Sequence, residues 1–157
     1  MKKAILLFAF AALSLQNINA TKRIYTKTDS IRAEKIMKQA SSQPAGTNTI
    51  VYIGRQLLGV PYVAQTLEKG KTENLVINTM QLDCTTFVEN VLAMYLCVQN
   101  KTTRFADFCS NIQKIRYAGG KVSYPSRLHY FSTRIEDNTK KGIVQEQQAP
   151  NPPFTAK

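Results

Sequence analysis

The segment QLDCTTFVEN, residues 81–90, contains the residue best suited to nucleophilic chemistry, Cys84. A helix is predicted to begin at this cysteine, because large apolar residues recur at helical spacing directly after it. The first N–H groups of a helix have no intrahelical partner and the helix dipole is positive there, so a thiolate at Cys84 is stabilised. The same N–H groups could hold the oxyanion of a tetrahedral intermediate. The alternative is a small, inert core cysteine.

Asp83 precedes this cysteine and is a suitable N-cap for the predicted helix. Thr86 and Glu89 form an alternative capping box, three residues apart. The negative charge of Asp83 opposes a neighbouring thiolate. That opposition is reduced if the carboxylate caps N–H groups or faces an amine of the substrate, so Asp83 is also a candidate substrate contact.

A cysteine nucleophile needs a general base, which is usually a histidine. His129, in the segment SRLHYF, is the only histidine of the chain. If this chain alone forms a Cys–His pair, His129 is therefore the base. The alternative is a histidine in an aromatic-rich loop that is satisfied by a hydrogen bond or contacts substrate.

The remaining cysteines, Cys97 and Cys109, fall on apolar faces of two predicted helices. Cys84 and Cys97 share one predicted helix and would lie roughly 20 Å apart, too far for a disulfide. Cys97 and Cys109 could meet across a helix–loop–helix, although we expect both to be core residues. With one histidine and no CxxC pair, the sequence does not predict a zinc site.

The N-terminus has the order of a secretory signal peptide over residues 1–20: two lysines, a short apolar run and a small-residue end at Ala20. The run is shorter than the roughly 20 apolar residues that cross a bilayer, so we expect cleavage, a periplasmic or secreted protein and no stable membrane insertion. The net charge is +11, but the basic residues are dispersed, and no nucleic-acid partner is expected. A basic binding protein for nucleic acid or anionic surfaces is an alternative that rests on charge alone.

The pattern along the chain predicts one small domain over residues 21–144 and a disordered Gln/Pro-rich tail over residues 145–157. Helices are predicted over residues 30–40, capped by Asp29 or Ser30, and over residues 49–59, capped by Gly59. Two more helices are predicted: a central, buried helix that starts near Cys84, and a helix with Phe105 and Ile115 on its apolar face. The other segments are predicted to be a loop with a brief strand at 75–77, a turn at 100–103, and short extended pieces over 117–135.

Three stretches occur in a fixed order: LLGVPYVAQTLE (57–68), ENLVINTMQLDCTTFVENVLAM (73–94) and YPSRLHYFSTRIEDNTKKGIV (124–144). Together they resemble the N-acetylmuramoyl-L-alanine amidase-like family of exported bacterial proteins, in the NlpC-type branch of the papain-like cysteine hydrolases. The resemblance covers roughly residues 28–144.

The resemblance implies a papain-like α+β fold, in which a helical layer carries the nucleophile at a helix N-terminus and packs on a small antiparallel sheet. Cys84 matches the family nucleophile, and Tyr62 matches an aromatic position at the edge of the active-site cleft. Other motif positions, implied to contact substrate or to take part in catalysis, are Glu89, Arg127, His129 and Tyr130.

The reaction implied is hydrolysis of the amide that joins the lactyl group of N-acetylmuramic acid to L-alanine in muropeptides, without a metal or other cofactor. Family members are longer, and their catalytic histidine lies on a strand of a C-terminal sheet. We therefore expect a C-terminally truncated domain that lacks most of this sheet. The alternative function is that of a catalytically inactive remnant that at most binds murein fragments.

Overall fold

The computed structural model describes residues 22–68, 70–145 and 147, so the predicted signal peptide and most of the predicted tail lie outside it. The described chain is mostly helical with one small sheet, an α+β-like arrangement. In order its elements are β1 (Arg23–Ile24), α1 (Lys27–Ser41), α2 (Thr49–Gln56), β2 (Leu75–Val76), α3 (Cys84–Gln99), α4 (Phe105–Arg116), the 3₁₀ turns η1 (Ala118–Gly120) and η2 (Tyr124–Ser126), and α5 (Phe131–Lys140). None of the described helices has the length and apolar character needed to cross a membrane.

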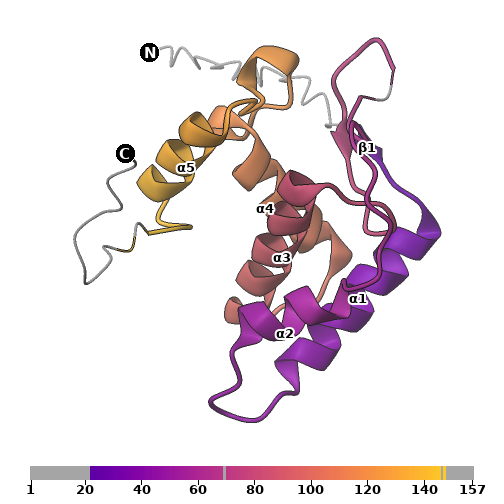
Figure 1. Cartoon of the computed structure of the whole chain (residues 1–157), viewed down its shortest axis with the longest axis vertical. Coiled ribbons are helices and arrows are strands. Elements are labelled where there is room, and N and C mark those ends of the chain that lie inside the picture. Colours follow the sequence, from indigo (N-terminus) through magenta and orange to yellow (C-terminus); the bar gives the residue numbers. More distant parts are fainter. Residues whose placement is uncertain (1–21, 69, 146, 148–157) are drawn as a thin grey trace, which may run out of the picture.

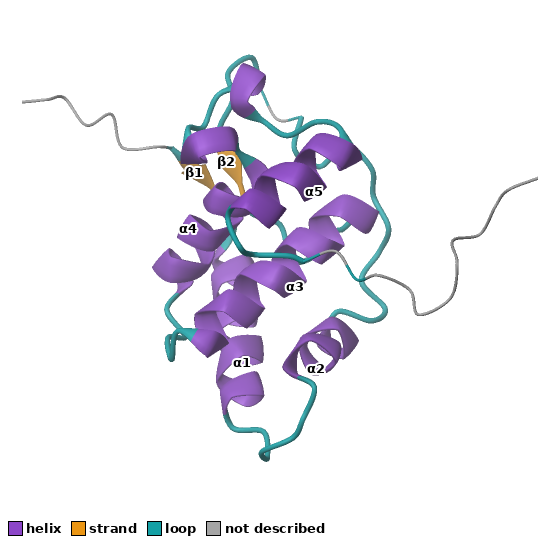
Figure 2. Cartoon of the chain, turned by 90° about the vertical axis from the view of Figure 1, so that its left-hand side faces the viewer, coloured by secondary structure: helices purple, strands orange, loops and turns teal. Residues whose placement is uncertain are grey.

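Helix α3 lies in the middle of the molecule, as the sequence predicted, and packs against α1, α2 and α4. In both views α1 and α2 lie toward one end of α3 and α5 toward the other (Figures 1 and 2). Cys97 of α3 and Cys109 of α4 are fully buried in this core, and both thiols are free. The prediction that they are core residues is confirmed. Burial raises the pKa of each thiol to about 11.

The ends of α1 and α2 differ from the prediction. The N-cap of α1 is Thr26, because Thr26 Oγ1 accepts from the N–H of Asp29 while Asp29 Oδ2 accepts from the N–H of Thr26. Asp29 is thus the third residue of the helix and the partner of Thr26 in a capping box. The prediction that Asp29 or Ser30 is the N-cap is wrong. Helix α2 ends at Gln56 rather than at Gly59, and Gly59 forms part of the following turn with φ +77°.

The strands β1 and β2 form a parallel pair, with Arg23 opposite Leu75 and Ile24 opposite Val76. The brief strand predicted at residues 75–77 is confirmed to within one residue. An antiparallel sheet was expected from the resemblance, but the two-stranded sheet of the described chain is parallel. Between residues 22 and 145 the chain thus consists of helices around α3 with a short sheet beside them (Figure 2).

Helix α5 occupies a segment whose first half was predicted to be extended, and that prediction is wrong. Hydrophobic periodicity does not find this helix because Phe131 and Ile135 are its only large apolar residues. In the structure Phe131 is 77% exposed and Asn138 is the only buried residue of the helix. Its N-terminus has no side-chain cap. Polar contacts hold it instead: Asn138 Nδ2 donates to the carbonyl of Ile115 at 3.0 Å, and Arg134 pairs with Glu89.

Candidate active site

Cys84 is the first residue of α3, and its side chain is exposed. Asp83 caps the helix, as predicted: its Oδ1 accepts from the N–H of Thr86 at 2.7 Å and from Thr86 Oγ1 at 2.8 Å. Thr86 Oγ1 accepts in turn from the N–H of Asp83 at 2.9 Å. The capping box therefore pairs Asp83 with Thr86, and not Thr86 with Glu89. Because the Asp83 carboxylate is bound to the helix N-terminus, part of its opposition to a thiolate is removed.

The loop that leads into Cys84 is fixed by both neighbouring helices. Asp29 of α1 accepts through Oδ1 from the N–H and the hydroxyl of Thr79, at 2.7 and 2.9 Å. Asn90 of α3 donates to the carbonyl of Asn78 at 3.2 Å. Burial alone raises the pKa of Asp29, but its hydrogen bonds from Thr26 and Thr79 outweigh burial and lower it. The position of the cysteine thus depends on a buried, ionised carboxylate on another helix.

Tyr62 lies beside Cys84 because its segment pairs with Leu82, the residue before the helix cap. The N–H of Leu82 donates to the carbonyl of Pro61 at 3.1 Å, and the N–H of Val63 donates to the carbonyl of Leu82 at 3.0 Å. Tyr62 is largely exposed. A pocket of about 220 Å³ is lined by residues that include Tyr62, Leu82, Asp83, Cys84 and Phe87.

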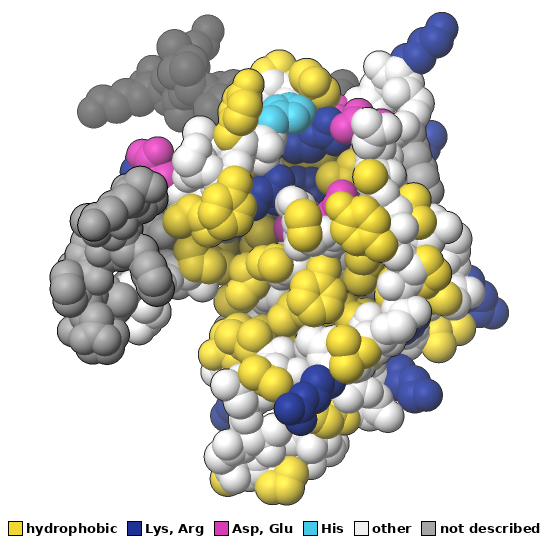
Figure 3. Space-filling model, viewed as in Figure 1, with side chains coloured by type: hydrophobic (Ala, Val, Ile, Leu, Met, Phe, Trp, Pro, Cys, Tyr) yellow, Lys and Arg dark blue, Asp and Glu magenta, His cyan; other side chains and the backbone are white. Residues whose placement is uncertain are grey.

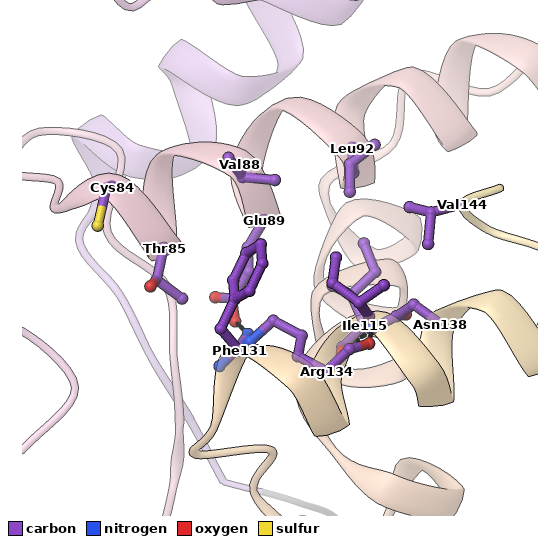
Figure 4. Close-up of a pocket in the computed structure, with 11 residues that line it drawn as sticks. Cys84, Thr85, Val88, Glu89, Leu92, Ile115, Phe131, Arg134, Asn138 and Val144 are labelled. Atoms are coloured by element: carbon purple, nitrogen blue, oxygen red, sulfur yellow. Dashed lines mark hydrogen bonds and ion pairs between the residues drawn. The ribbon is translucent and has the colours of Figure 1, made fainter. Parts of the chain in front are cut away.

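A second pocket, of about 240 Å³, opens on the other side of Cys84 between α3 and α5. Its lining is mainly apolar, and Figure 4 shows Cys84 at one end of it, with Val88 and Leu92 along α3 and Phe131 rising from α5. Cys84 therefore lines both the 220 Å³ pocket beside Tyr62 and the apolar 240 Å³ pocket between α3 and α5. On this face of the molecule hydrophobic side chains gather over α2, α3 and α5, around a hollow in which charged side chains are visible (Figure 3).

Glu89 lies deeper, beneath the apolar pocket, and its side chain is 1% exposed. Its Oε2 accepts from Arg116 Nε and Nη2 at 2.9 and 2.7 Å, and its Oε1 pairs with Arg134. Burial is the largest single influence on the pKa of Arg116 and lowers it, but the charge of Glu89, the hydrogen bonds to Glu89 and the neighbouring Tyr117 together raise it. The carboxylate thus ties α3 to α4 and α5, and its predicted contact with substrate stays a prediction.

His129 is exposed and is engaged away from the cysteine. Its Nε2 lies 2.9 Å from the carbonyl oxygen of Tyr124, and its ring packs against the Tyr124 ring at 4.5 Å. Within the described chain no hydrogen bond joins His129 to Cys84. His129 is thus a histidine in an aromatic-rich loop that is satisfied by a hydrogen bond, which is the alternative to a general base that the sequence left open. A role of His129 as the base remains a prediction.

Arg127 and Tyr130 flank this histidine in very different surroundings. Arg127 is buried: its Nη2 donates to Glu68 Oε1 at 2.6 Å, and its guanidinium lies 5.2 Å from the centre of the Tyr124 ring. Tyr130 is 75% exposed at the N-terminus of α5. A hollow of about 210 Å³ brings together Gln65, Glu68, Asp83, Arg127, His129 and Arg134.

Sequence reasoning missed several of these residues, namely Gln65, Glu68, Arg116 and Arg134. Glu68, Arg116 and Arg134 each act through a partner distant in sequence, so no local spacing could have found them. Gln65 and Glu68 lie within the first matched stretch, at residues 57–68, and Arg134 within the third, at residues 124–144. The described residues contain no group of three or more His, Cys, Asp or Glu side chains able to hold a metal.

The family follows from comparison with known proteins. A model of the AmiA-like family, described as N-acetylmuramoyl-L-alanine amidase-like, matches residues 52–152. The chain belongs to this N-acetylmuramoyl-L-alanine amidase-like family. No protein with a curated description matches it.

Solved structures agree with this assignment. Two structures of an N-acetylmuramoyl-L-alanine amidase from Bacteroides uniformis are similar at 40% and 38% identity, with TM-scores of 0.54 and 0.52, and cover 71% and 70% of this chain. A Bacteroides fragilis protein described as a candidate xylanase is similar at 47% identity over 57% of the chain, with a TM-score of 0.54. The matches cover 41%, 40% and 39% of those proteins, so the chain spans about two fifths of their length.

Proposed function

We propose that this chain is a cell-wall amidase that cleaves the bond between N-acetylmuramic acid and L-alanine in peptidoglycan fragments. The observation that carries the proposal is an exposed cysteine at the capped first turn of α3, in a chain of the N-acetylmuramoyl-L-alanine amidase-like family. The substrate class is taken from the family and from the amidase of Bacteroides uniformis. The assignment to the NlpC-type, papain-like hydrolases is part of the proposal and rests on the sequence resemblance.

In the proposed mechanism the Cys84 thiolate attacks the carbonyl carbon of the lactyl group. A carbon–sulfur bond forms, the carbon–nitrogen bond breaks, and the amine of L-alanine leaves after it gains a proton. Water then hydrolyses the thioester and releases the muramoyl carboxylate. The cap on α3 uses the N–H of Thr86, so the N–H groups of Cys84 and Thr85 are assigned to the oxyanion.

The other residues have proposed roles around this step. Tyr62 and Asp83 contact substrate in the 220 Å³ pocket, and Arg127 and Tyr130 contact it near the start of α5. His129 would carry the proton to the amine once its ring exchanges the Tyr124 carbonyl for substrate. Residues 1–20 would direct export, for which the expected sign is a mature protein that begins at Thr21, measured by mass spectrometry of the secreted chain.

A second candidate function is a murein-binding protein without catalysis. The observation that favours it is the engagement of His129 with the Tyr124 carbonyl, which leaves Cys84 without a hydrogen-bonded histidine among the described residues. Such a protein would retain the pockets beside α3, and so the affinity for fragments, but would lack turnover.

One assay separates the two functions. The purified chain is incubated with an N-acetylmuramoyl-L-alanyl peptide, and the peptide with a free amine and N-acetylmuramic acid are quantified by mass spectrometry. An amidase releases both, and Cys84→Ser reduces the rate by about 10³-fold or more, whereas Cys109→Ala, a change at a buried thiol, keeps it. Saturable binding without release in the unmodified chain would replace the amidase by the binding protein.

A further inference from the structure

The polar hollow beside the start of α3 has the features of a binding subsite. It measures about 210 Å³ and includes Asp83, the residue next to Cys84, on its wall. Its lining also contains Arg127, His129 and Arg134, which are cationic or titratable, and the carboxylate of Glu68. A ligand group in this hollow would therefore lie next to the nucleophile end of α3.

Arg127 is held in this hollow with part of its guanidinium unused. The side chain is 5% exposed, and Nη2 donates to Glu68 Oε1 at 2.6 Å. Nη1 is buried and makes no hydrogen bond within the described chain, although it forms a longer ion pair, at 3.6 Å, with Oε1 of Glu73. That Glu73 oxygen is already bound by the hydroxyl of Tyr117 at 2.6 Å. Buried donors are seldom left without a partner, so this one marks a place where a ligand acceptor fits.

Glu68 is the group that a ligand would displace. It is 56% exposed and touches the guanidinium through one contact only, whereas arginine binds a carboxylate best through two parallel N–H donors. In the same loop Gln65 has φ +59°, a left-handed conformation uncommon for a residue with a side chain, and the buried hydroxyl of Thr66 has no described partner. An exposed carboxylate that is held by one hydrogen bond is suited to exchange.

The other charges around the hollow are already balanced. Arg134 pairs with Glu89 and donates through Nη2 to the carbonyl of Leu128 at 2.6 Å. Oδ1 of Asp83 is bound to the N-terminus of α3. Arg127 is therefore the guanidinium whose partner can change.

We propose that this hollow is a carboxylate-binding subsite, in which Arg127 accepts a carboxylate on the peptide side of the scissile amide while Glu68 moves aside. The identity of the ligand rests on the proposed amidase function; the carboxylate chemistry rests on Arg127 and Glu68. The closed pair of Glu68 with Arg127 is then the empty state of the subsite.

The test uses N-acetylmuramoyl-L-alanine and its carboxamide, which differ only in the carboxylate, with binding measured by calorimetry on the Cys84→Ala protein so that no turnover is needed. The acid is expected to bind roughly tenfold more tightly than the amide, the ratio that one charge-assisted hydrogen-bonded pair gives. Glu68→Gln removes the internal competitor and strengthens binding of the acid several-fold but not of the amide. Arg127→Gln abolishes the preference.

Glu136→Gln removes the same charge from the exposed face of α5 and leaves both affinities unchanged. Glu68 is mostly exposed, so its variant folds and keeps the test decisive even if Arg127→Gln is unstable. Equal affinities for acid and amide, no binding of either compound, or weaker binding of the acid by Glu68→Gln would each overturn the subsite. A failure of cleavage with the preference intact counts against the proposed amidase and not against the subsite.

Discussion

Replacement of Glu89 by glutamine removes the one negative charge that two arginines share inside the molecule. Glu89 and Arg116 are 1% and 2% exposed, and Arg134 is 14% exposed on the other side of the carboxylate. In Glu89→Gln both guanidinium groups keep their charge in a place where water cannot solvate Arg116. Loss of one partner from a buried ion pair costs about 3–5 kcal/mol, a large share of the roughly 5–15 kcal/mol that stabilises a domain.

Urea unfolding followed by circular dichroism measures this loss. With a typical slope of about 1–3 kcal/mol per molar urea, the midpoint is expected to fall by roughly 2 M. Glu136→Gln, which breaks an exposed pair with Lys140 on α5, is the matched control and should leave the midpoint nearly unchanged. A combined change of Glu89 and Arg116 to apolar residues should cost less than the sum of the two single changes, because neither charge is left behind.

A loss of less than about 1 kcal/mol in Glu89→Gln would refute this reasoning. It would mean that water reaches the two arginines, and that the carboxylate is free to meet a ligand from the apolar pocket. The result therefore also decides whether Glu89 positions α3, α4 and α5 or is available to substrate.

Three further predictions concern other parts of the molecule. Asp29→Asn is expected to lower the free energy of unfolding by about 1.5–3 kcal/mol near neutral pH. Because folding lowers the pKa of Asp29, this difference is present above pH 3.8, the ordinary pKa, and it disappears as the pH falls through the pKa of the folded protein. Urea unfolding at a series of pH values measures it. In the native protein a thiol reagent should titrate Cys84 rapidly and reach Cys97 and Cys109, which are buried with a pKa of about 11, only after guanidinium unfolds the chain. Gly54→Ala should raise the thermal midpoint and add about 0.5–1 kcal/mol to the free energy of unfolding, because a glycine inside a helix is unfavourable. The added methyl group meets its nearest side-chain atom at 3.6 Å, an ordinary contact distance. A lower midpoint would show that the approach of α2 to α3 leaves no room for the methyl group.

Elements with a strong apolar period were predictable from the sequence. Helix α3 begins at Cys84 as expected, and α4 lies where the pattern placed it, because the buried faces of both helices repeat at helical spacing. The short β2 also lies where its run of apolar residues indicated a strand. The N-cap at Asp83 was also predictable, since capping acts within three residues.

What the sequence could not predict depends on partners far along the chain. The pair of Arg116 with Glu89 joins residues 27 apart, and that of Arg127 with Glu68 joins residues 59 apart. Helix α5 is held by such contacts and has only two large apolar residues, Phe131 and Ile135, so its periodicity carried little signal. The candidate site therefore combines a cysteine at a predictable helix start with a charged environment that only the fold assembles.

The most direct test of the central claim is whether a muramoyl thioester forms on Cys84. The protein is mixed with an N-acetylmuramoyl-L-alanyl peptide and quenched in acid within its first turnover, and the intact mass and the digested peptides are measured. We expect a mass increase equal to one N-acetylmuramoyl group, located on the peptide that contains Cys84 and absent from Cys84→Ala. Cleavage at an unchanged rate in Cys84→Ala, with no acylated peptide, would contradict it.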